Sequence, residues 1–560
     1  MTEARYWTYQ EMTATLNGWQ TAYPDLFQVE AMGKSRSGRD LWAATICSDV
    51  RHAADYPALL VDANIHAGEV AGNAVAMHWI GTLLEGYQKA PAIQELLQTR
   101  AVYVVPRIAV DGAEEYLTSP NRLRSSPHWY PLDDPLPGWV AGDVDGNGHI
   151  LTMRMPGADG AYAVDEIDPR LMRRRRPGEF GEQYYHVFVE GKVQAPKRQG
   201  AALLASRLDL SVPQGMDFNR NFPVRWATED SQKGAGPFPL SEPEIHALAG
   251  FVASHPNIAA YVALHTSGGV ILRQPSTGDD SQIPATDAGL FSRMAEEGAR
   301  VSGYFARSNF ETFHNGYDAV LMPGAADDWM YDHQGVLGFT VEIWDLPRHA
   351  GARGYAEHGV KGLMKLSDEE RQEDLRKVVN FVEEKVPTQG FFPWTDFEHP
   401  DLGPVQIGGL DPKFVVQNPP LCFLEEECER VGRFLTTLGL STASLTAGPV
   451  RSEKIGDNVY RITAMVRNQG FLPTSGTGRG WGMKRVSGVQ ALLEGDYEMI
   501  SGESPSRLGH LSGYGSLEAS APPGDNRRTA EWVVRAPQGS SLSVVFSAPR
   551  AGTARVQIDL

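Results

Sequence analysis

The chain has 560 residues and a formal net charge of −18 at pH 7, which disfavours nucleic acid and anionic membranes as partners because binding to them depends on positive charge. Its length exceeds what one ordinary core holds and predicts two or three domains. Its three cysteines allow at most one disulfide, which excludes a disulfide-stapled secreted scaffold.

The first residues lack the basic start and apolar core of a secretory signal. No later run has the 18 or so uninterrupted apolar residues of a membrane span. We therefore expect a cytoplasmic protein, or a secreted one if a leader has been removed.

From about residue 6 to 390, apolar β-like runs alternate with helical patterns, which is typical of an α/β domain. The most distinct predicted strands are Leu59–Ile65, Ala101–Val105, Ile258–Leu264 and Phe339–Ile343. Two capping boxes, Ser241–Glu244 and Ser367–Glu370, predict the starts of helices, because a serine oxygen and a glutamate three residues later can satisfy free backbone amides.

Between about 125 and 215 the sequence is rich in Pro, Gly, Asp and Arg with little periodicity, which predicts a long insertion at the rim of this domain. Within it, Asp143, Asp145 and Asn147 match the first half of a calcium loop, but Arg154 replaces the glutamate expected at position twelve. The pattern favours a tight Asp/Gly turn over a calcium site. The basic cluster at 170–176 indicates solvated or ion-paired arginines.

The C-terminal part of the chain differs from the rest in composition and periodicity. Residues 391–445, with a helical pattern at Leu424–Leu438, are assigned to the first domain, which therefore spans 1–445. From 446 to 560, period-two segments alternate with Gly, Pro and Ser clusters, which predicts an all-β sandwich-like accessory domain. This part shows no catalytic residues, and its ligand is not predicted.

Two histidines and a glutamate stand at the ends of predicted buried strands. His66 and Glu69 follow Leu59–Ile65, and His265 follows Ile258–Leu264. A catalytic zinc requires three nitrogen or oxygen ligands from the protein and a fourth position for water, and strand ends are where open α/β sheets place their sites. The alternative is that both histidines are buried in the core without a metal.

Glu342 alternates with apolar residues on the strand Phe339–Ile343, so its side chain points away from one packed face. A carboxylate there is either paired with a cation or faces a water-filled cleft.

Six segments resemble motifs of the M14 family of zinc carboxypeptidases (metallocarboxypeptidases), and they occur in the order in which that family has them. They are His66–Glu69, Asn121–Arg124, Asp217–Phe222, Ser241–Glu244, His265–Ser267 and Thr340–Asp345. The resemblance covers about 1–390 apart from the insertion. It implies a mixed eight-stranded sheet flanked by helices, with one zinc ion held by His66, Glu69 and His265.

The resemblance also implies roles for other residues. Glu342 corresponds to the general base, and Asn219 and Arg220 correspond to the pair that binds the carboxylate at the end of a peptide. Arg122 and Arg124 compete for the residue that stabilises the oxyanion, and we favour Arg124. Two further candidates are Tyr317, as the tyrosine that covers the substrate, and Asp327, as an acidic floor that favours Lys or Arg side chains.

One departure from the family pattern is Gly68, where many members have arginine. The main hypothesis is a zinc-dependent carboxypeptidase acting on peptides. The alternatives are an amidase or endopeptidase that uses the same residues on cell-wall peptides or acylated amino acids, and a non-catalytic binding protein.

Overall fold

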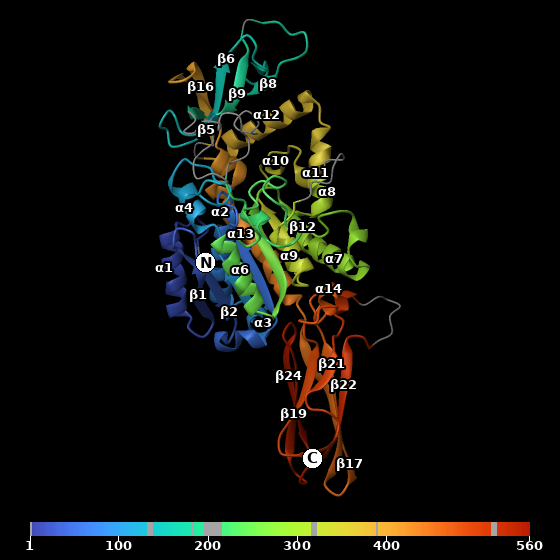
Figure 1. The fold of residues 1–560 in the computed structure, drawn as a ribbon. Coiled ribbons are helices and arrows are strands. Elements are labelled where there is room, and N and C mark those ends of the chain that lie inside the picture. Colours follow the sequence, from blue (N-terminus) through green and yellow to red (C-terminus); the bar gives the residue numbers. More distant parts are fainter. Residues whose placement is uncertain are drawn as a thin grey trace.

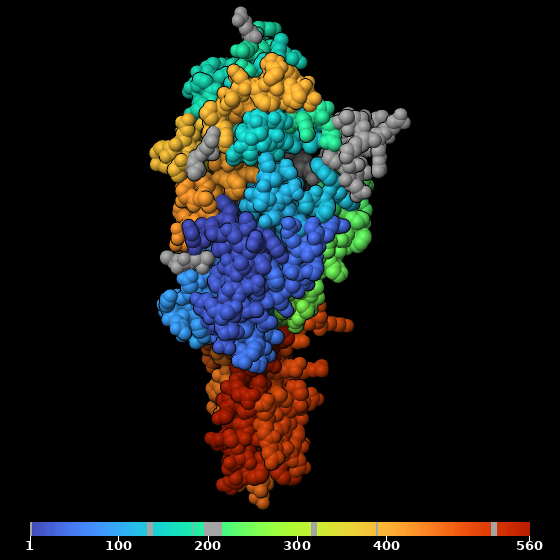
Figure 2. All heavy atoms as spheres, turned by 90° about the vertical axis from the view of Figure 1, so that its left-hand side faces the viewer, coloured from blue at the N-terminus to red at the C-terminus, as the bar shows by residue number. Residues whose placement is uncertain are grey.

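The computed structural model describes residues 3–130, 138–181, 183–194, 215–314, 322–387, 390–516 and 524–560. The molecule is elongated, with an α/β body in the middle (Figure 1). Figure 2 shows a narrow lower end formed by the C-terminal residues, and an upper end formed by the insertion and residues near 400. No helix in the described part of the chain is long and apolar enough to cross a membrane.

The body is built on an eight-stranded sheet of order β1-β2-β4-β3-β11-β14-β12-β13. The central strands β4, β3, β11 and β14 are parallel to one another. β1 pairs antiparallel with β2 and β2 with β4, and β12 is antiparallel to β14 but parallel to β13. The mixed eight-stranded sheet predicted from the sequence is thereby confirmed. The strands are β1 (Phe27–Lys34), β2 (Asp40–Ile46), β3 (Ala58–Ala63), β4 (Ala101–Val105), β11 (Ile258–Thr266), β12 (Val270–Arg273), β13 (Phe305–Ser308) and β14 (Leu337–Ile343).

Helices cover both faces of this sheet, so β3 and β11 are buried along their whole length. Leu59 and Val61 join a core with α2, α7 and α13, whereas Leu60 joins a second core with α6 and α9. The helices are α1 (Tyr9–Ala22), α2 (Val70–Gly86), α3 (Pro91–Thr99), α4 (Val110–Thr118), α6 (Pro243–Ser254), α7 (Ala285–Ser302), α8 (Asn309–Phe313), α9 (Ala326–Asp332), α10 (Leu346–His349), α11 (Tyr355–Met364), α12 (Asp368–Lys385) and α13 (Leu421–Leu440).

One of the two predicted capping boxes is wrong. Ser367 caps α12 with Glu370 as expected, but α6 starts after Glu242 and has no side-chain cap. The hydroxyl of Ser241 instead accepts a hydrogen bond from the Asn221 amide, 3.0 Å away. A buried polar partner distant in the sequence therefore replaces the local cap.

The insertion contains regular structure that the sequence did not predict. Its strands β6 (Thr152–Pro156), β7 (Tyr162–Val164), β8 (Met172–Arg174) and β9 (Tyr185–Val189) form a six-stranded sheet with β15 (Phe391–His399) and β16 (Gly403–Leu410), in the order β15-β16-β6-β9-β7-β8. A separate pair joins β5 (Gly138–Ala141) to β10 (Gly191–Gln194). The insertion strands have three to five residues, which is too short to show a period of two.

The basic cluster of the insertion is ion-paired within the molecule. Arg170 binds Asp168, and Arg173 binds both Glu166 and Glu179.

The C-terminal residues form two antiparallel four-stranded sheets that share one apolar core. The first sheet contains β17 (Leu445–Gly456), β18 (Val459–Asn468), β20 (Glu498–Ser501) and β22 (Arg527–Arg535), and the second β19 (Val489–Glu494), β21 (Ser506–Gly509), β23 (Ser541–Ala548) and β24 (Gly552–Asp559). A short helix, α14 (Gly478–Trp481), lies beside the body (Figure 1). The all-β sandwich expected from the sequence is present.

Candidate active site

The candidate site lies at the carboxyl ends of β3, β11 and β14. After β3 the chain turns through His66 to Glu69, and α2 starts at the next residue. His265 lies near the end of β11 and pairs in register with Glu342 on β14. Because parallel strands end at one edge of a sheet, residues far apart in the sequence meet there.

His66, Glu69 and His265 converge through three ligand atoms. The Nδ1 atoms of the two histidines are 3.2 Å apart. Nδ1 of His66 is 2.8 Å from Oε1 of Glu69, and Nδ1 of His265 is 2.9 Å from Oε2. Ligands about 2.0–2.1 Å from a tetrahedral zinc lie about 3.3 Å from one another. The distances between the three ligand atoms here are therefore close to those around a zinc ion. Each of the three residues is only 3% exposed.

The second nitrogen of His66 has a partner that orients the ring. Its Nε2 lies 3.1 Å from Oδ1 of Asp217, an arrangement that places the proton on Nε2 and leaves Nδ1 free to bind a metal. Burial raises the pKa of Asp217, but the charges of Arg124, Arg220 and His66 outweigh it and hold the pKa well below its ordinary value. Asp217 is therefore an anion that faces Nε2 of the proposed metal ligand His66.

A cavity of about 260 Å³ opens beside the three ligand residues. Among its lining residues are five predicted from the sequence, namely Arg124, Asn219, Arg220, Asp327 and Glu342. Burial raises the pKa of Glu342 to about 7, which suits a group that accepts and releases a proton near neutral pH.

The structure separates the two competing arginines. Arg124 points into the site, where its Nε donates to Asp217 at 2.9 Å and its Nη1 to Glu69 at 3.3 Å. Arg122 is exposed and does not line the cavity. Position alone thus favours Arg124, although its role stays a prediction.

Asn219 and Arg220 belong to a short 3-10 turn, η2 (Phe218–Arg220), which the Asp217 carboxylate caps by accepting from the Asn219 amide. Oδ1 of Asn219 accepts from the backbone amide of Ala326 at 2.8 Å, an arrangement that leaves its NH₂ group for the cavity. Nη1 of Arg220 donates to the carbonyl of Asn219 at 2.7 Å. Both donors are therefore fixed in place beside the cavity.

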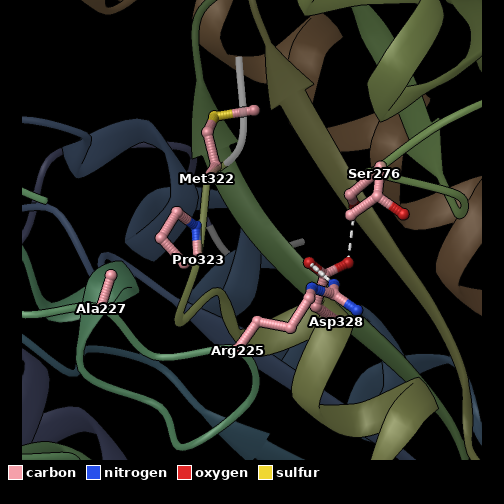
Figure 3. Close-up of a pocket in the computed structure, with 7 residues that line it drawn as sticks. Arg225, Ala227, Ser276, Met322, Pro323 and Asp328 are labelled. Atoms are coloured by element: carbon pink, nitrogen blue, oxygen red, sulfur yellow. Dashed lines mark hydrogen bonds and ion pairs between the residues drawn. The ribbon is translucent and has the colours of Figure 1, made fainter. Parts of the chain in front are cut away.

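Two adjacent aspartates, Asp327 and Asp328, line the cavity and differ in their partners. Asp328 binds the guanidinium of Arg225 and accepts from the Ser276 hydroxyl at 2.6 Å, across a smaller hollow of about 150 Å³ (Figure 3). Asp327 accepts from the Asn309 side chain at 2.8 Å and from the Asp328 amide at 2.9 Å. Among the described residues, no cation forms an ion pair with Asp327, which is 5% exposed.

Several lining residues had no signal in the sequence. Tyr355 reaches the cavity from α11, and its hydroxyl donates to the carbonyl of Ser267. Asn309 reaches it from the start of α8, and Ser276 from the loop after β12. No short motif marks these residues, because only the tertiary fold brings them to the cavity. The lid candidate Tyr317 lies outside the described residues.

The predicted calcium half-loop is a tight turn in which Asp143 accepts from the amides of Gly146 and Gly148, and Asn147 bonds to Asp145. Position twelve, Arg154, does not join it and stacks on Trp394 instead. A carboxylate that the sequence did not indicate, that of the buried Glu190, lies within 4.8 Å of Asp143 and Asp145. Its oxygens accept from the amides of Val144 and Leu151.

A model of the zinc carboxypeptidase family matches residues 12–136 and 159–357, more than half of the chain. The chain belongs to the zinc carboxypeptidase family. Residues 444–559 match a domain of unknown function.

Similar proteins cover parts of the chain. It is 30% identical over 109 residues to a zinc carboxypeptidase of Saccharothrix mutabilis subsp. capreolus, over 20% of this chain and 25% of that one. It is 31% identical over 350 residues to carboxypeptidase B2 of Bos taurus, over 61% of this chain and 63% of that one. The crystal structure of thrombin activatable fibrinolysis inhibitor matches 68% of this chain and 76% of that chain, with a TM-score of 0.40 and 19% identity. The first curated relatives are thus matched over only a quarter to a third of their length.

Proposed function

We propose that this protein is a zinc-dependent metallocarboxypeptidase that removes residues from the C-terminus of peptides. The observation that carries the proposal is the cluster of three ligand atoms of His66, Glu69 and His265, with Glu342 lining the same cavity. Two imidazole nitrogens and one carboxylate are ligands that zinc prefers. The family of the chain supports this donor set.

When bound, zinc supplies a Lewis acid that makes water reactive near neutral pH and polarises the scissile carbonyl. Glu342 acts as the general base: its carboxylate takes a proton from the attacking water and returns it to the departing amine. Its burial and its pKa of about 7 support both transfers. The Arg124 guanidinium stabilises the negative charge that develops on the carbonyl oxygen.

Asn219 and Arg220 select the end of the peptide. A guanidinium binds a carboxylate through two parallel hydrogen bonds, and the Asn219 NH₂ group adds a donor beside it. Burial lowers the pKa of Arg220, although the charges of Asp217 and Asp327 oppose this effect. A partly buried cation at this position favours an anion from the substrate, and the terminal carboxylate provides one.

Asp327 gives the side-chain subsite a preference for Lys and Arg. Its two oxygens each accept one hydrogen bond, from the Asn309 side chain and from the Asp328 amide, and neither donor carries a charge. A buried carboxylate without a cation is costly, so a positively charged side chain of the substrate gains by binding next to it. The neighbouring Asp328 has no such requirement, because Arg225 already neutralises it.

The test combines metal content with hydrolysis on one preparation. We expect about one zinc ion per chain, and rapid cleavage of a peptide with a free C-terminal carboxylate but almost none of the same peptide amidated at its C-terminus. Equal cleavage of both peptides would support the amidase or endopeptidase alternative. Zinc binding that is unchanged in His265→Ala would contradict the proposed metal centre.

A further inference from the structure

A segment beyond the family match, residues 411–418, touches the loops that carry the candidate site. Its first part is a π-helical turn, η4 (Pro412–Gln417), whose start is capped by Asp411. The family model ends at residue 357, so this segment lies outside the residues that the model matches. It packs against the loop between β3 and α2, the end of α4, and the residues that follow β14.

The contact with the metal loop is made by Asn418, which is completely buried. Its Nδ2 donates to the carbonyl of Gly68 at 2.7 Å, and its Oδ1 accepts from the amide of Ala71 at 3.0 Å. These two backbone groups stand on either side of Glu69. One carboxamide therefore spans the turn that presents this ligand.

The start of α2 explains why such a contact is needed. The first amides of a helix have no partner within the helix, and the side chain of the N-cap residue usually binds one of them. The N-cap residue of α2 is Glu69, whose side chain makes no capping hydrogen bond. Its carboxylate faces the two histidines instead. Asn418 supplies the cap that a metal ligand cannot provide.

The same segment holds two neighbouring parts of the site. The ammonium group of Lys413 donates to the carbonyls of Tyr116 and Ser119 at 2.6 Å each, at the end of α4 and before the loop that leads to Arg124. Two residues after Glu342, the indole of Trp344 donates to the carbonyl of Val415 at 2.8 Å.

A Cβ atom at Gly68 would lie 2.8 Å from Nε2 of Gln417. The segment therefore occupies the space that a side chain at position 68 would need.

We infer that Asn418 is a positioning residue for the metal centre, which holds Glu69 in its ligating orientation by capping α2 from a segment outside the residues that the family model matches. The inference rests on the proposed function, since it requires that Glu69 binds zinc. It predicts that loss of the carboxamide loosens the metal while the rest of the fold persists. Partners of this kind behind a metal ligand typically change metal affinity by about 10- to 100-fold.

The experiment measures how fast zinc leaves the full-length protein in the presence of excess chelator. Asn418→Ala is compared with Asn257→Ala, a matched control at the opposite end of β11. Asn257 is also buried, and its side chain donates to the carbonyls of Ala53 and Tyr56 at 3.1 and 2.9 Å. Both variants should lower the thermal stability of the metal-free protein. Only Asn418→Ala should release zinc faster, by about tenfold.

Equal release from Asn418→Ala and Asn257→Ala would overturn the inference and leave the proposed function intact. A wild-type protein that holds no stoichiometric zinc would overturn both. If Asn418→Ala does not fold, Asn418→Asp keeps the size and the acceptor for Ala71 but loses the donor to Gly68. It should also release zinc faster than the wild type, and unchanged release from it would again contradict the inference.

Discussion

Replacing Asp327 by asparagine tests whether this cavity-lining carboxylate sets the substrate preference. The change removes the charge and preserves the size of the side chain. Loss of one partner from a buried, hydrogen-bonded charge pair costs about 2–4 kcal/mol, and 1.4 kcal/mol corresponds to a factor of ten. We therefore expect kcat/KM for peptides ending in Lys or Arg to fall by roughly 30- to 1000-fold. Peptides ending in Phe should be affected little.

The assay uses peptides that differ only in the last residue, and its readout is the ratio of kcat/KM for Lys against Phe. Asp328→Asn is the matched control, because Asp328 is adjacent and 2% exposed but is paired with Arg225. This control should lose stability and keep its preference for Lys. Asp327→Asn should also lose some stability, because its amide can accept only one of the two hydrogen bonds made to Asp327. An unchanged Lys/Phe ratio in Asp327→Asn would refute the assignment.

Further predictions concern the base, the two arginines, a buried acid and the junction with the sandwich. Glu342→Gln should keep zinc but lose at least about 10³-fold in kcat, and turnover near the wild-type rate would exclude Glu342 as the base. Arg124→Gln should lower kcat by about 10²- to 10³-fold, whereas Arg122→Gln, which changes an exposed residue, should leave kcat unchanged. A larger loss of kcat in Arg122→Gln would assign the oxyanion-stabilising role to Arg122 instead. Burial raises the pKa of Glu244 from its ordinary value of about 4.5 to about 7. Between these two pH values the folded protein keeps a proton on Glu244 that the unfolded chain has released. The free energy of unfolding therefore falls as the pH rises through this range. Glu244→Gln should therefore stabilise the protein by up to about 3 kcal/mol at pH 8 and hardly at all at pH 4, as measured by urea unfolding. Equal effects at both pH values would contradict the argument that burial raises this pKa. Arg550→Ala should lower the free energy of unfolding by about 2–4 kcal/mol without loss of zinc, because its guanidinium donates to carbonyls of both the body and the sandwich.

The parts of the fold that the sequence predicted are those with strong local signals. β3 and β11 are largely apolar because helices cover both of their faces, although β3 contains the buried Asp62. This pattern is visible without a structure. The sheet of the insertion was missed for the opposite reason. β6 pairs with β9 on one side and with β16, more than 240 residues later, on the other. Five residues of mixed character do not indicate either partner.

The site shows the same division between local and tertiary information. His66, Glu69, His265 and Glu342 could be found because each follows or interrupts an apolar strand. The spacing near Asn121 left Arg122 and Arg124 in competition, with Arg124 favoured, and it could not predict the ion pairs of Arg124 with Asp217 and Glu69. Asn418 had no signal at all, since an asparagine between a glutamine and two prolines reads as an ordinary turn. Its capping of α2 exists only in the folded chain.

The position of the sandwich limits what it can do for the reaction. Arg550, in the turn before β24, donates to the carbonyls of Pro256, just before β11 begins, and of Gly335, just before β14 begins. The candidate site lies at the other end of the same two strands, and the nine residues of β11 span about 30 Å at 3.3 Å each. The sandwich also extends away from the body (Figure 1). It is therefore attached at the end of these strands opposite the metal ligands, away from a substrate bound beside Glu342.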